Sequence, residues 1–518
     1  MLFTKDGSQI AVPDAVWSGH ALTLDASPIL LPSGPHHLLP YTLENYRALR
    51  SAGVAVQSPI RTQYQWSGRY TPFEHQKNIA SFLTLHHKAF VLADMGAGKT
   101  HAALWAMDYL MRMGEVKRVL ILCTLSTLVE VWERTLFFHF PHLTTYVVHG
   151  SAKKKLTTNH KQHQHTNVFI ANHELTRSSD RMLFQRELPV DLLIVDEGAE
   201  YREAKTQKYR GLRALSLKIP KIWWLTATPT PDAPTDAWAQ AVALGTAQGM
   251  TFAQFREATM YKEGLYRWQP KRGATELVKR VLSPAIRYKL EDCVDLPGIT
   301  YTTRRADMTP AQAAAYTKLK NESVIELQQA KITAVNEAVK ANKLLQVASG
   351  IVYDDTGQER HVEATHKLGI LEEVIVEAGT PIIAFVPFRS VAHFLYERFK
   401  ARYSSAVVLG DVNLADRTSI FSRFQKGEIR LLIAHPKTMS HGLTLTSAAT
   451  IVWVAPIWSN NIYTQANARI YRPGQTRHCT IVNLVSSQVE TEIYQRLKDK
   501  QTLQGALLDM LTRDQKSV

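Results

Sequence analysis

Three short segments carry side chains that can act on a nucleoside triphosphate. Residues 93–100 read A-D-M-G-A-G-K-T, residues 191–197 read D-L-L-I-V-D-E, and residues 465–472 read Q-A-N-A-R-I-Y-R. The first segment can hold phosphates, the second can hold Mg²⁺ and activate water, and the third can supply arginines to a γ-phosphate. Together they predict hydrolysis of a nucleoside triphosphate between two lobes.

The first segment has the composition of a phosphate-binding loop. It follows a short apolar run, and a helical pattern begins after it. Gly96 and Gly98 allow backbone N–H groups to turn toward phosphates, and the helix adds its positive end. Lys99 is expected to reach the β- and γ-phosphates, and the Thr100 hydroxyl is expected to bind Mg²⁺. The other nucleotide-binding residues expected from this loop are Asp94, Met95, Ala97 and His101.

An acidic pair, Asp196 and Glu197, closes the apolar run of the second segment. The carboxyl end of a parallel strand lies at the ligand crevice of such a sheet. Asp196 is therefore expected to hold Mg²⁺, directly or through water, and Glu197 to polarise the attacking water. The alternative is an ordinary solvated loop that begins after a strand.

The third segment places Gln465, Arg469 and Arg472 at i, i+4 and i+7, on one face of a helix. The catalytic interpretation is that Arg469 and Arg472 stabilise charge on the transferring γ-phosphoryl group, with Gln465 beside them in the site. The alternative is a solvated charged stripe. The spacing leaves open which arginine would be the finger.

The elements that must position these residues are predicted by short apolar runs alternating with helical patterns. Such runs indicate an α/β fold in which parallel sheets are covered on both faces. The runs of the first lobe are 89–93, 119–123, 146–148, 168–171, 192–195 and 222–225. A second series begins near Pro381 with I-I-A-F-V and continues with A-V-V-L, L-L-I-A, T-I-V-W-V and T-I-V-N-L-V.

The chain of 518 residues is long enough for about three domains. We expect an N-terminal accessory region at 1–65, built of small strands and loops. A first lobe at 66–300 contains a helical insertion at about 232–290. A second lobe at 301–510 contains a helical insertion at about 310–350 and the arginine segment, and 511–518 form a tail.

Composition narrows the class of protein. The net charge of +15 suits a polyanionic partner, although a basic surface kept for solubility is the alternative. The three cysteines are far apart, which indicates neither zinc nor disulfides and favours a reducing compartment. Neither a membrane-spanning run nor a signal peptide is evident. We expect a cytoplasmic protein from a bacterial host or phage, or a nuclear one if the source is eukaryotic.

The order of these and further segments resembles the superfamily 2 helicase-type motors of the Swi/Snf-related group, over about residues 70–500. The matching segments are Y-T-P-F-E-H-Q (70–76), L-I-L-C-T-L-S-T-L-V-E-V-W (120–132), N-H-E-L-T (172–176), the acidic box and its loop (196–210), L-T-A-T-P-T (225–230), D-L-P-G (295–298), M-T-P-A-Q-A-A-A-Y (308–316), L-L-Q-V-A-S-G (344–350), H-G-L-T-L-T-S-A (441–448) and Q-A-N-A-R-I-Y-R-P-G-Q (465–475).

The resemblance implies two RecA-like lobes that bind ATP and Mg²⁺. It implies that Gln76 reads adenine while an aromatic residue, Phe73, stacks on it, and that Gly442 lies in a loop touching strand and nucleotide. It also implies that residues 120–132 and 172–176 contact nucleic acid, and that 225–230 couple hydrolysis to movement. One departure is Glu200, which stands where the family commonly has histidine.

We therefore expect an ATP-dependent DNA translocase or helicase, a DNA-stimulated ATP hydrolase that moves along or remodels duplex or branched DNA without sequence preference. The first alternative is an RNA-directed helicase. The second is a non-catalytic or partner-gated interaction module with a motor fold, whose protein partner would dock on residues 1–65. A monomer is the default expectation.

Overall fold

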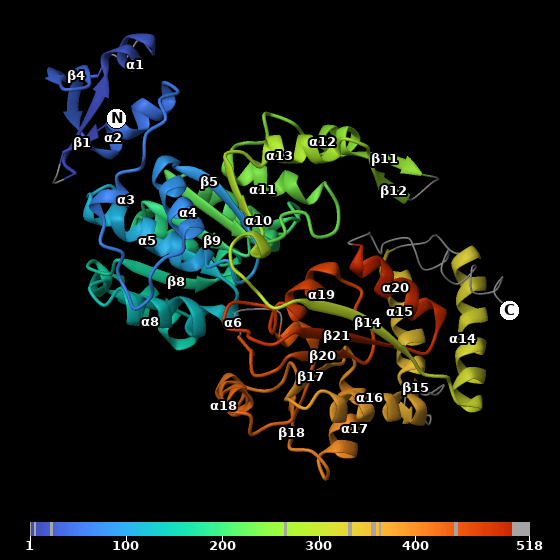
Figure 1. Cartoon of the computed structure of the whole chain (residues 1–518). Coiled ribbons are helices and arrows are strands. Elements are labelled where there is room, and N and C mark those ends of the chain that lie inside the picture. Colours follow the sequence, from blue (N-terminus) through green and yellow to red (C-terminus); the bar gives the residue numbers. More distant parts are fainter. Residues whose placement is uncertain are drawn as a thin grey trace. The chain divides into compact units, whose positions relative to one another are not determined.

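A computed structural model describes residues 2–4, 7–20, 24–263, 267–329, 334–353, 359–361, 364–439 and 444–499. The chain divides into two compact units (Figure 1). The first consists of Met1–Thr230, Thr235–Arg256 and Gly273–Cys293, and the second of Pro231–Pro234, Glu257–Arg272 and Val294–Val518. Each unit is built around a parallel sheet. Within the described ranges, no helix is long and apolar enough to cross a membrane.

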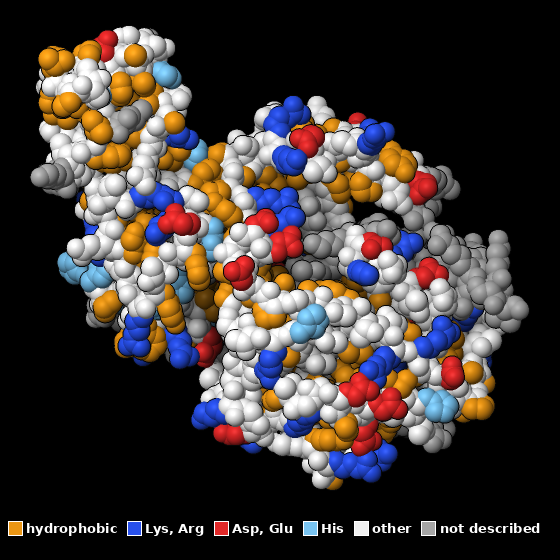
Figure 2. Space-filling model, viewed as in Figure 1, with side chains coloured by type: hydrophobic (Ala, Val, Ile, Leu, Met, Phe, Trp, Pro, Cys, Tyr) orange, Lys and Arg blue, Asp and Glu red, His pale blue; other side chains and the backbone are white. Residues whose placement is uncertain are grey.

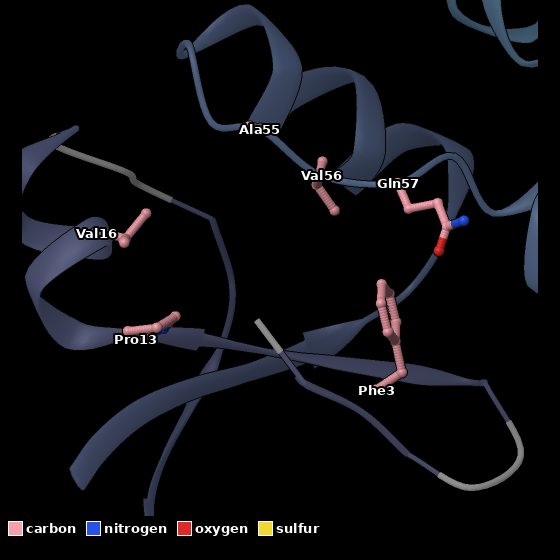
Figure 3. Close-up of a pocket in the computed structure, with 6 residues that line it drawn as sticks. All are labelled: Phe3, Pro13, Val16, Ala55, Val56 and Gln57. Carbon is pink, nitrogen blue, oxygen red and sulfur yellow. The ribbon is translucent and has the colours of Figure 1, made fainter. Parts of the chain in front are cut away.

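The N-terminal region forms a small antiparallel sheet of order β1-β2-β4-β3. Its strands are β1 (Leu2–Phe3), β2 (Gln9–Pro13), β3 (Ser27–Leu31) and β4 (Gly34–Pro40). Helices α1 (Asp14–Gly19), α2 (Leu43–Ser51) and α3 (Ile60–Gln63) accompany it. Ile10, Val12, Leu39 and Leu49 are fully buried and form the core of this sheet. A pocket of about 350 Å³ lies between the sheet, α1 and residues 55–57 (Figure 3).

One arginine of α2 joins this small sheet to the rest of the first unit. The Arg47 guanidinium donates to both carboxylate oxygens of Glu115, at 2.8 and 2.9 Å, and to the Thr84 carbonyl, at 2.8 Å. Such a two-pronged contact fixes orientation as well as distance. The N-terminal sheet is therefore held at the end of α4 (Glu74–Leu85) and just beyond α5 (Lys99–Arg112).

The central sheet of the first unit has seven strands in the order β13-β5-β10-β9-β6-β8-β7. All its strand pairs are parallel. The strands are β5 (Lys88–Ala93), β6 (Val119–Cys123), β7 (Thr145–Val148), β8 (Val168–Asn172), β9 (Leu192–Asp196), β10 (Lys221–Thr226) and β13 (Ala285–Tyr288). The six apolar runs predicted for this lobe are six of these strands, so the predicted sheet is confirmed; the edge strand β13 was not predicted.

Helices cover the sheet and fill the connections between its strands. Besides α4 and α5 they are α6 (Leu125–Thr127), the π-helix η1 (Leu128–Glu133), α7 (Arg134–His139), α8 (Gly150–Thr158), α9 (Leu183–Arg186) and α10 (Gln207–Ser216). The lysine run 153–155 lies in α8, and Lys153 is paired with Asp180 at 2.8 Å. No metal-binding cluster of histidine, cysteine and carboxylate side chains occurs in the part of the chain that is described.

Residues 232–290 contain helices, as expected, and also a hairpin that was not expected. The helices are α11 (Asp236–Leu244), α12 (Phe252–Thr259) and α13 (Ala274–Val281). The hairpin consists of β11 (Met260–Glu263) and β12 (Arg267–Pro270), paired antiparallel. Its short strands mix charged and aromatic residues, so they lack the apolar run by which the other strands were recognised.

The second unit has a six-stranded parallel sheet of order β14-β21-β20-β17-β19-β18. Its strands are β14 (Ile299–Arg305), β17 (Ile382–Phe385), β18 (Ser405–Val408), β19 (Leu431–Ala434), β20 (Thr450–Trp453) and β21 (Cys479–Val485). Its helices are α14 (Pro310–Gln329), α15 (Ala334–Ala348), α16 (Thr365–Glu377), α17 (Arg389–Phe399), α18 (Leu414–Gln425), α19 (Asn460–Asn467) and α20 (Gln488–Lys498), and a short pair, β15 (Ile351–Tyr353) and β16 (Glu359–His361), follows α15. The predicted α/β fold with two parallel-sheet lobes is confirmed.

A buried ion pair ties α16 to α20 inside the second unit. The Lys367 ammonium donates to Glu490 Oε1 at 2.7 Å and to the Ala348 carbonyl at 3.3 Å. The side chains of Lys367 and Glu490 are 4% and 0% exposed. The other carboxylate oxygen of Glu490 accepts the backbone N–H groups of Ser486 and Ser487. These bonds compensate the carboxylate charge in a place that water does not reach.

Replacing Lys367 with methionine is expected to cost about 3–5 kcal/mol in the free energy of unfolding, because it leaves the buried Glu490 charge without its counter-ion. Denaturant titration measures the change. Lys400→Met is the control, because Lys400 pairs with Glu397 on the surface and such pairs contribute about 0–1 kcal/mol. Equal losses in the two variants would contradict the structural role of the buried pair.

Candidate nucleotide site

The phosphate loop connects β5, which ends at Ala93, to α5, which begins at Lys99. Gly96 and Gly98 have φ values of +85° and +74°, in the region that favours glycine. The Lys99 ammonium donates to the Ala93 carbonyl at 2.6 Å and to the Asp94 carbonyl at 3.1 Å. The loop thus has the strand–turn–helix geometry that suits phosphate binding, with its lysine folded back onto the loop.

The N-terminal turn of α4 packs directly on this loop. A Cβ atom on Gly98 would lie 1.9 Å from Gln76 Nε2, so no other residue fits there without moving Gln76. Gln76 Oε1 accepts the Phe73 N–H at 3.0 Å, and a ring nitrogen of His75 hydrogen-bonds the Ala97 carbonyl at 2.9 Å. The Phe73 ring is 52% exposed. Gln76 therefore lies beside the loop, and its carboxamide is bonded to the backbone of Phe73.

His101 follows the loop within the first turn of α5. Burial lowers the pKa of His101 to about 4, so its imidazole is neutral at physiological pH. Its Nε2 atom is buried and has no hydrogen-bond partner among the described residues. The His101 ring contacts Tyr70 and His139 edge-on, with centroid distances of 5.7 and 5.1 Å.

Asp196 is the last residue of β9 and is buried. Its Oδ2 accepts the Trp132 indole N–H at 2.9 Å, and its Oδ1 accepts the Glu197 N–H at 3.1 Å. Burial, followed by the negative charge of Glu197, raises the pKa of Asp196 to about 6, although Trp132 and the Lys99 ammonium oppose the shift. The Asp196 carboxylate feels the charge of Lys99, which begins α5 and precedes Thr100, and a carboxylate and a hydroxyl are oxygen donors of the kind that suits Mg²⁺. The residues present therefore fit the expected metal.

Glu197 adopts a backbone conformation that is rare for its residue type. Its φ is +50°, and Gln248 is the only other described residue besides glycines with a positive φ. Such strain is often found at functional sites. The next residue, Gly198, cannot carry a side chain, because its Cβ would lie 1.8 Å from the Trp224 indole nitrogen. Trp224 in turn donates to Gln240 Oε1 at 2.9 Å, and Gln240 Nε2 donates to the Pro229 carbonyl at 2.5 Å.

The side chain of Glu200, which stands where the family commonly has histidine, lies at the surface. Its carboxylate pairs with the Lys208 ammonium at 2.8 Å, and its side chain is 40% exposed. On the L-T-A-T-P-T segment, the Thr226 hydroxyl is buried and has no hydrogen-bond partner in the part of the chain that the structure describes.

The arginine segment does not lie on one helical face, which corrects the interpretation of its spacing. Helix α19 ends at Asn467, so Gln465 is helical but Arg469 and Arg472 lie beyond the end. The chain cannot continue as a helix toward Pro473, and the residue before a proline disfavours helical geometry.

Arg469 is 3% exposed and its Nε donates to the Gln465 carbonyl at 2.9 Å. Desolvation lowers the pKa of Arg472 to about 10, which leaves it cationic at neutral pH. Gly442 lies outside the described residues.

The residues that hold the acidic pair in place could not be recognised from the sequence motifs. Trp132 and Trp224 are fully buried, and Gln240 has no exposed surface. Trp132 lies in one of the segments that resemble the family, and its indole N–H donates to Asp196; the Trp224 indole N–H, which lies against Gly198, donates to Gln240. A buried tryptophan next to a polar motif is the signal that could have indicated such a bond.

Comparison with protein-family models identifies two regions. Residues 75–354 match the SNF2-related domain, and residues 366–474 match the helicase conserved C-terminal domain. The first match alone covers more than half of the chain. The chain belongs to the SNF2-related family. It therefore carries a SNF2-family ATPase/helicase core, and this family is ATP-hydrolysing.

Individual relatives of this SNF2-related chain are distant. Protein p41 of Acyrthosiphon pisum secondary endosymbiont phage 1 is 26% identical over 86% of this chain and 99% of its own length. Chromodomain-helicase-DNA-binding protein 1-like of Danio rerio is 22% identical over 80% of this chain, which spans only 41% of that protein. The solved Sulfolobus solfataricus SWI2/SNF2 ATPase core in complex with dsDNA is 22% identical, covers 87% of this chain and 96% of its own, and has a TM-score of 0.41.

Replacing Asp196 with asparagine is expected to stabilise this SNF2-related chain in the absence of metal. A raised folded-state pKa means that folding disfavours the ionised carboxyl, so wild-type stability falls as pH rises from about 4 to about 6. Near pH 7.5 the variant should gain less than about 3 kcal/mol in the free energy of unfolding, because its amide NH2 must face one of the two N–H donors that the carboxylate accepts; the gain is measured by denaturant titration with EDTA present. Asp292→Asn, at an exposed position, is the control. A less stable Asp196→Asn protein would show that the carboxylate is needed for the fold.

Proposed function

We propose that this chain is a DNA-stimulated ATPase that moves along or remodels duplex or branched DNA without reading its sequence. The observation that carries the proposal is the phosphate loop and acidic pair within a SNF2-related domain. The names of two relatives refer to DNA: the Danio protein above, and DNA repair and recombination protein RAD54-like of Drosophila persimilis, which is 24% identical over 81% of this chain. The net charge of +15 suits a phosphate backbone.

In this proposal the first lobe binds the nucleotide. The loop backbone beyond Asp94 and the positive end of α5 bind the phosphates, and Lys99 exchanges its carbonyl acceptors for phosphate oxygens. Thr100 and Asp196 hold Mg²⁺, which when bound offsets the charge that develops on the phosphates. Glu197 orients the attacking water and accepts its proton.

The adenine end of the nucleotide is assigned to the turn that precedes α4. Gln76 lies against Gly98, so a base recognised by its carboxamide would be next to the phosphate loop. The exposed Phe73 ring offers a stacking surface.

In this proposal the second lobe supplies the arginines that stabilise the charge developing on the γ-phosphoryl group. Arg472 is the proposed finger, because a desolvated guanidinium interacts strongly with a phosphoryl group whose charge is developing. Arg469 and Gln465 are proposed to shape the turn that presents it, since Arg469 is buried and bonded to the Gln465 carbonyl.

Charge alone does not outline the DNA-binding surface. Lysine and arginine side chains are spread over the visible face of each unit and alternate with acidic ones (Figure 2). The proposed DNA contacts are therefore the exposed residues of the segments that resemble such contacts in the family, 120–132 and 172–176; residues 120–123 are buried in β6 and serve only to position the rest. Binding through phosphates should be strongly salt-dependent and largely independent of sequence.

The test is ATP hydrolysis by the purified chain alone and with duplex DNA, single-stranded DNA and RNA, with Glu197→Gln as the inactive control. Stimulation by duplex DNA that the variant lacks would support the proposal. Stimulation only by RNA would favour an RNA-directed helicase. Absence of hydrolysis with every polymer would contradict the proposal in its present form and would indicate either a requirement for a protein partner or an inactive motor.

A further inference from the structure

The segment after β6 has one face that is exposed and one that reaches the acidic pair. It comprises α6, the π-helix η1 and α7, residues 125–139. Leu125, Val129 and Phe137 are 52%, 37% and 71% exposed, whereas Trp132 is fully buried. A π-helix is rare and is found frequently at functional sites, because its extra residue turns side chains that a regular helix would align differently.

The inward contact is made by a single side chain. The Trp132 indole N–H donates to Asp196 Oδ2 at 2.9 Å. Both residues are buried, Trp132 with 0% and Asp196 with 7% of its surface exposed, so water does not readily replace this bond. A hydrogen bond to a carboxylate is stronger than a neutral one, and more so in a dry interior. Asp196 Oδ1 is already held by the Glu197 N–H, so the indole fixes the rotation of the carboxylate about its last torsion angle.

The outward face has the composition of a nucleic-acid contact. The Arg69 and Arg134 guanidinium groups lie over the Phe138 ring, 5.2 and 5.8 Å from its centroid, and the Phe137 ring stands beside it. Exposed aromatic rings with adjacent arginines bind nucleic acid by stacking and by charge. Residues of one short segment therefore face both solvent and the carboxylate proposed to bind Mg²⁺.

We propose that Trp132 is a positioning residue that orients Asp196 for Mg²⁺ and transmits the occupancy of the exposed face of residues 125–139 to that carboxylate. The transmission of occupancy from the exposed face rests on the proposed function. The orientation of Asp196 by Trp132 does not, because it does not require DNA. Outer partners of metal ligands typically change metal affinity or activity by about 10–100-fold when they are removed.

The experiment compares wild type, Trp132→Phe and Trp223→Phe. Trp223 is the matched control: it is fully buried in β10, and its indole also donates one hydrogen bond, to the His86 carbonyl at 3.2 Å. The first readout is binding of a fluorescent ATP analogue as Mg²⁺ is titrated. Trp132→Phe should raise the Mg²⁺ concentration at half-saturation by about 10-fold, and Trp223→Phe by less than about 2-fold.

The second readout is the ratio of ATP hydrolysis with and without duplex DNA at saturating Mg²⁺. Trp132→Phe should lower this ratio, whereas Trp223→Phe should retain it. If wild type shows no stimulation by DNA, the proposed function fails, but the Mg²⁺ titration still decides the orienting role. If wild type is stimulated and the two variants behave alike in both readouts, the inference is overturned while the proposed function stands.

A measurement on wild type covers the case in which Trp132→Phe does not fold. Hydrogen exchange of peptides from residues 125–139 is compared with ATP analogue plus Mg²⁺ and with ATP analogue plus EDTA. Because the indole and the metal would hold the same carboxylate, Mg²⁺ should slow exchange in this segment. Equal exchange in the two conditions would overturn the inference.

Discussion

Replacing Glu197 with glutamine is expected to lower kcat for ATP hydrolysis by about 10²–10⁴-fold, the contribution typical of a general base. Glutamine has the same shape and can adopt the φ of +50° as well as glutamate does, so the turn before Gly198 should be kept. It cannot accept a proton from water. Phosphate release measures kcat, and a fluorescent ATP analogue should bind with unchanged affinity.

Glu203→Gln is the control for this substitution. Glu203 is exposed and lies in the same loop, so the variant has the same change of charge without a change at the strand end. It should hydrolyse ATP at the wild-type rate. A Glu197→Gln protein that keeps more than about a tenth of wild-type kcat would show that another group activates the water.

Replacing Arg472 with alanine is expected to lower kcat by about 10³–10⁵-fold, the effect of removing an arginine finger. Arg472→Lys should restore little of this loss, because an ammonium is a point charge and lacks the planar fork that contacts two oxygens. Steady-state hydrolysis with duplex DNA measures the loss, and the thermal midpoint should stay close to that of wild type.

Arg469→Ala distinguishes the two arginines. Arg469 is almost completely buried and its Nε is bonded to the Gln465 carbonyl, so its removal leaves a void and an unsatisfied acceptor. Activity and the thermal midpoint should therefore fall together in Arg469→Ala. If Arg469→Ala lowered only kcat and Arg472→Ala lowered the thermal midpoint, Arg469 would be the finger and Arg472 the structural residue.

The strands of both sheets could be predicted because each central strand is buried on both faces and reads as a continuous apolar run, as in Ile382–Phe385. The phosphate loop could be predicted because its chemistry is contained in consecutive residues. Contacts between distant segments could not, since nothing in the order of residues indicates that Trp132 meets Asp196 or that Arg47 meets Glu115.

The helical spacing of the arginine segment shows a second limit. Residues at i, i+4 and i+7 share a face only if the helix continues, and α19 ends at Asn467. Pro473 shows that a helix could not continue through this segment, but the observed C-cap is Ala468, five residues earlier, and no glycine or proline marks that position. The hairpin of β11 and β12 shows a third limit, because its strands have no apolar face long enough to be read from sequence.

The guanidinium of Arg47 has a consequence for where this protein can be shortened. The SNF2-related match begins at residue 75, yet Glu115 and the carbonyl that ends α4 receive their hydrogen bonds from a residue that precedes it. A chain trimmed to the matched region would lack Arg47. The Glu115 carboxylate and the Thr84 carbonyl would then lose the hydrogen bonds that Arg47 donates and would be exposed to solvent. The start of the SNF2-related match therefore does not coincide with the start of the first compact unit, which also includes the residues before 75.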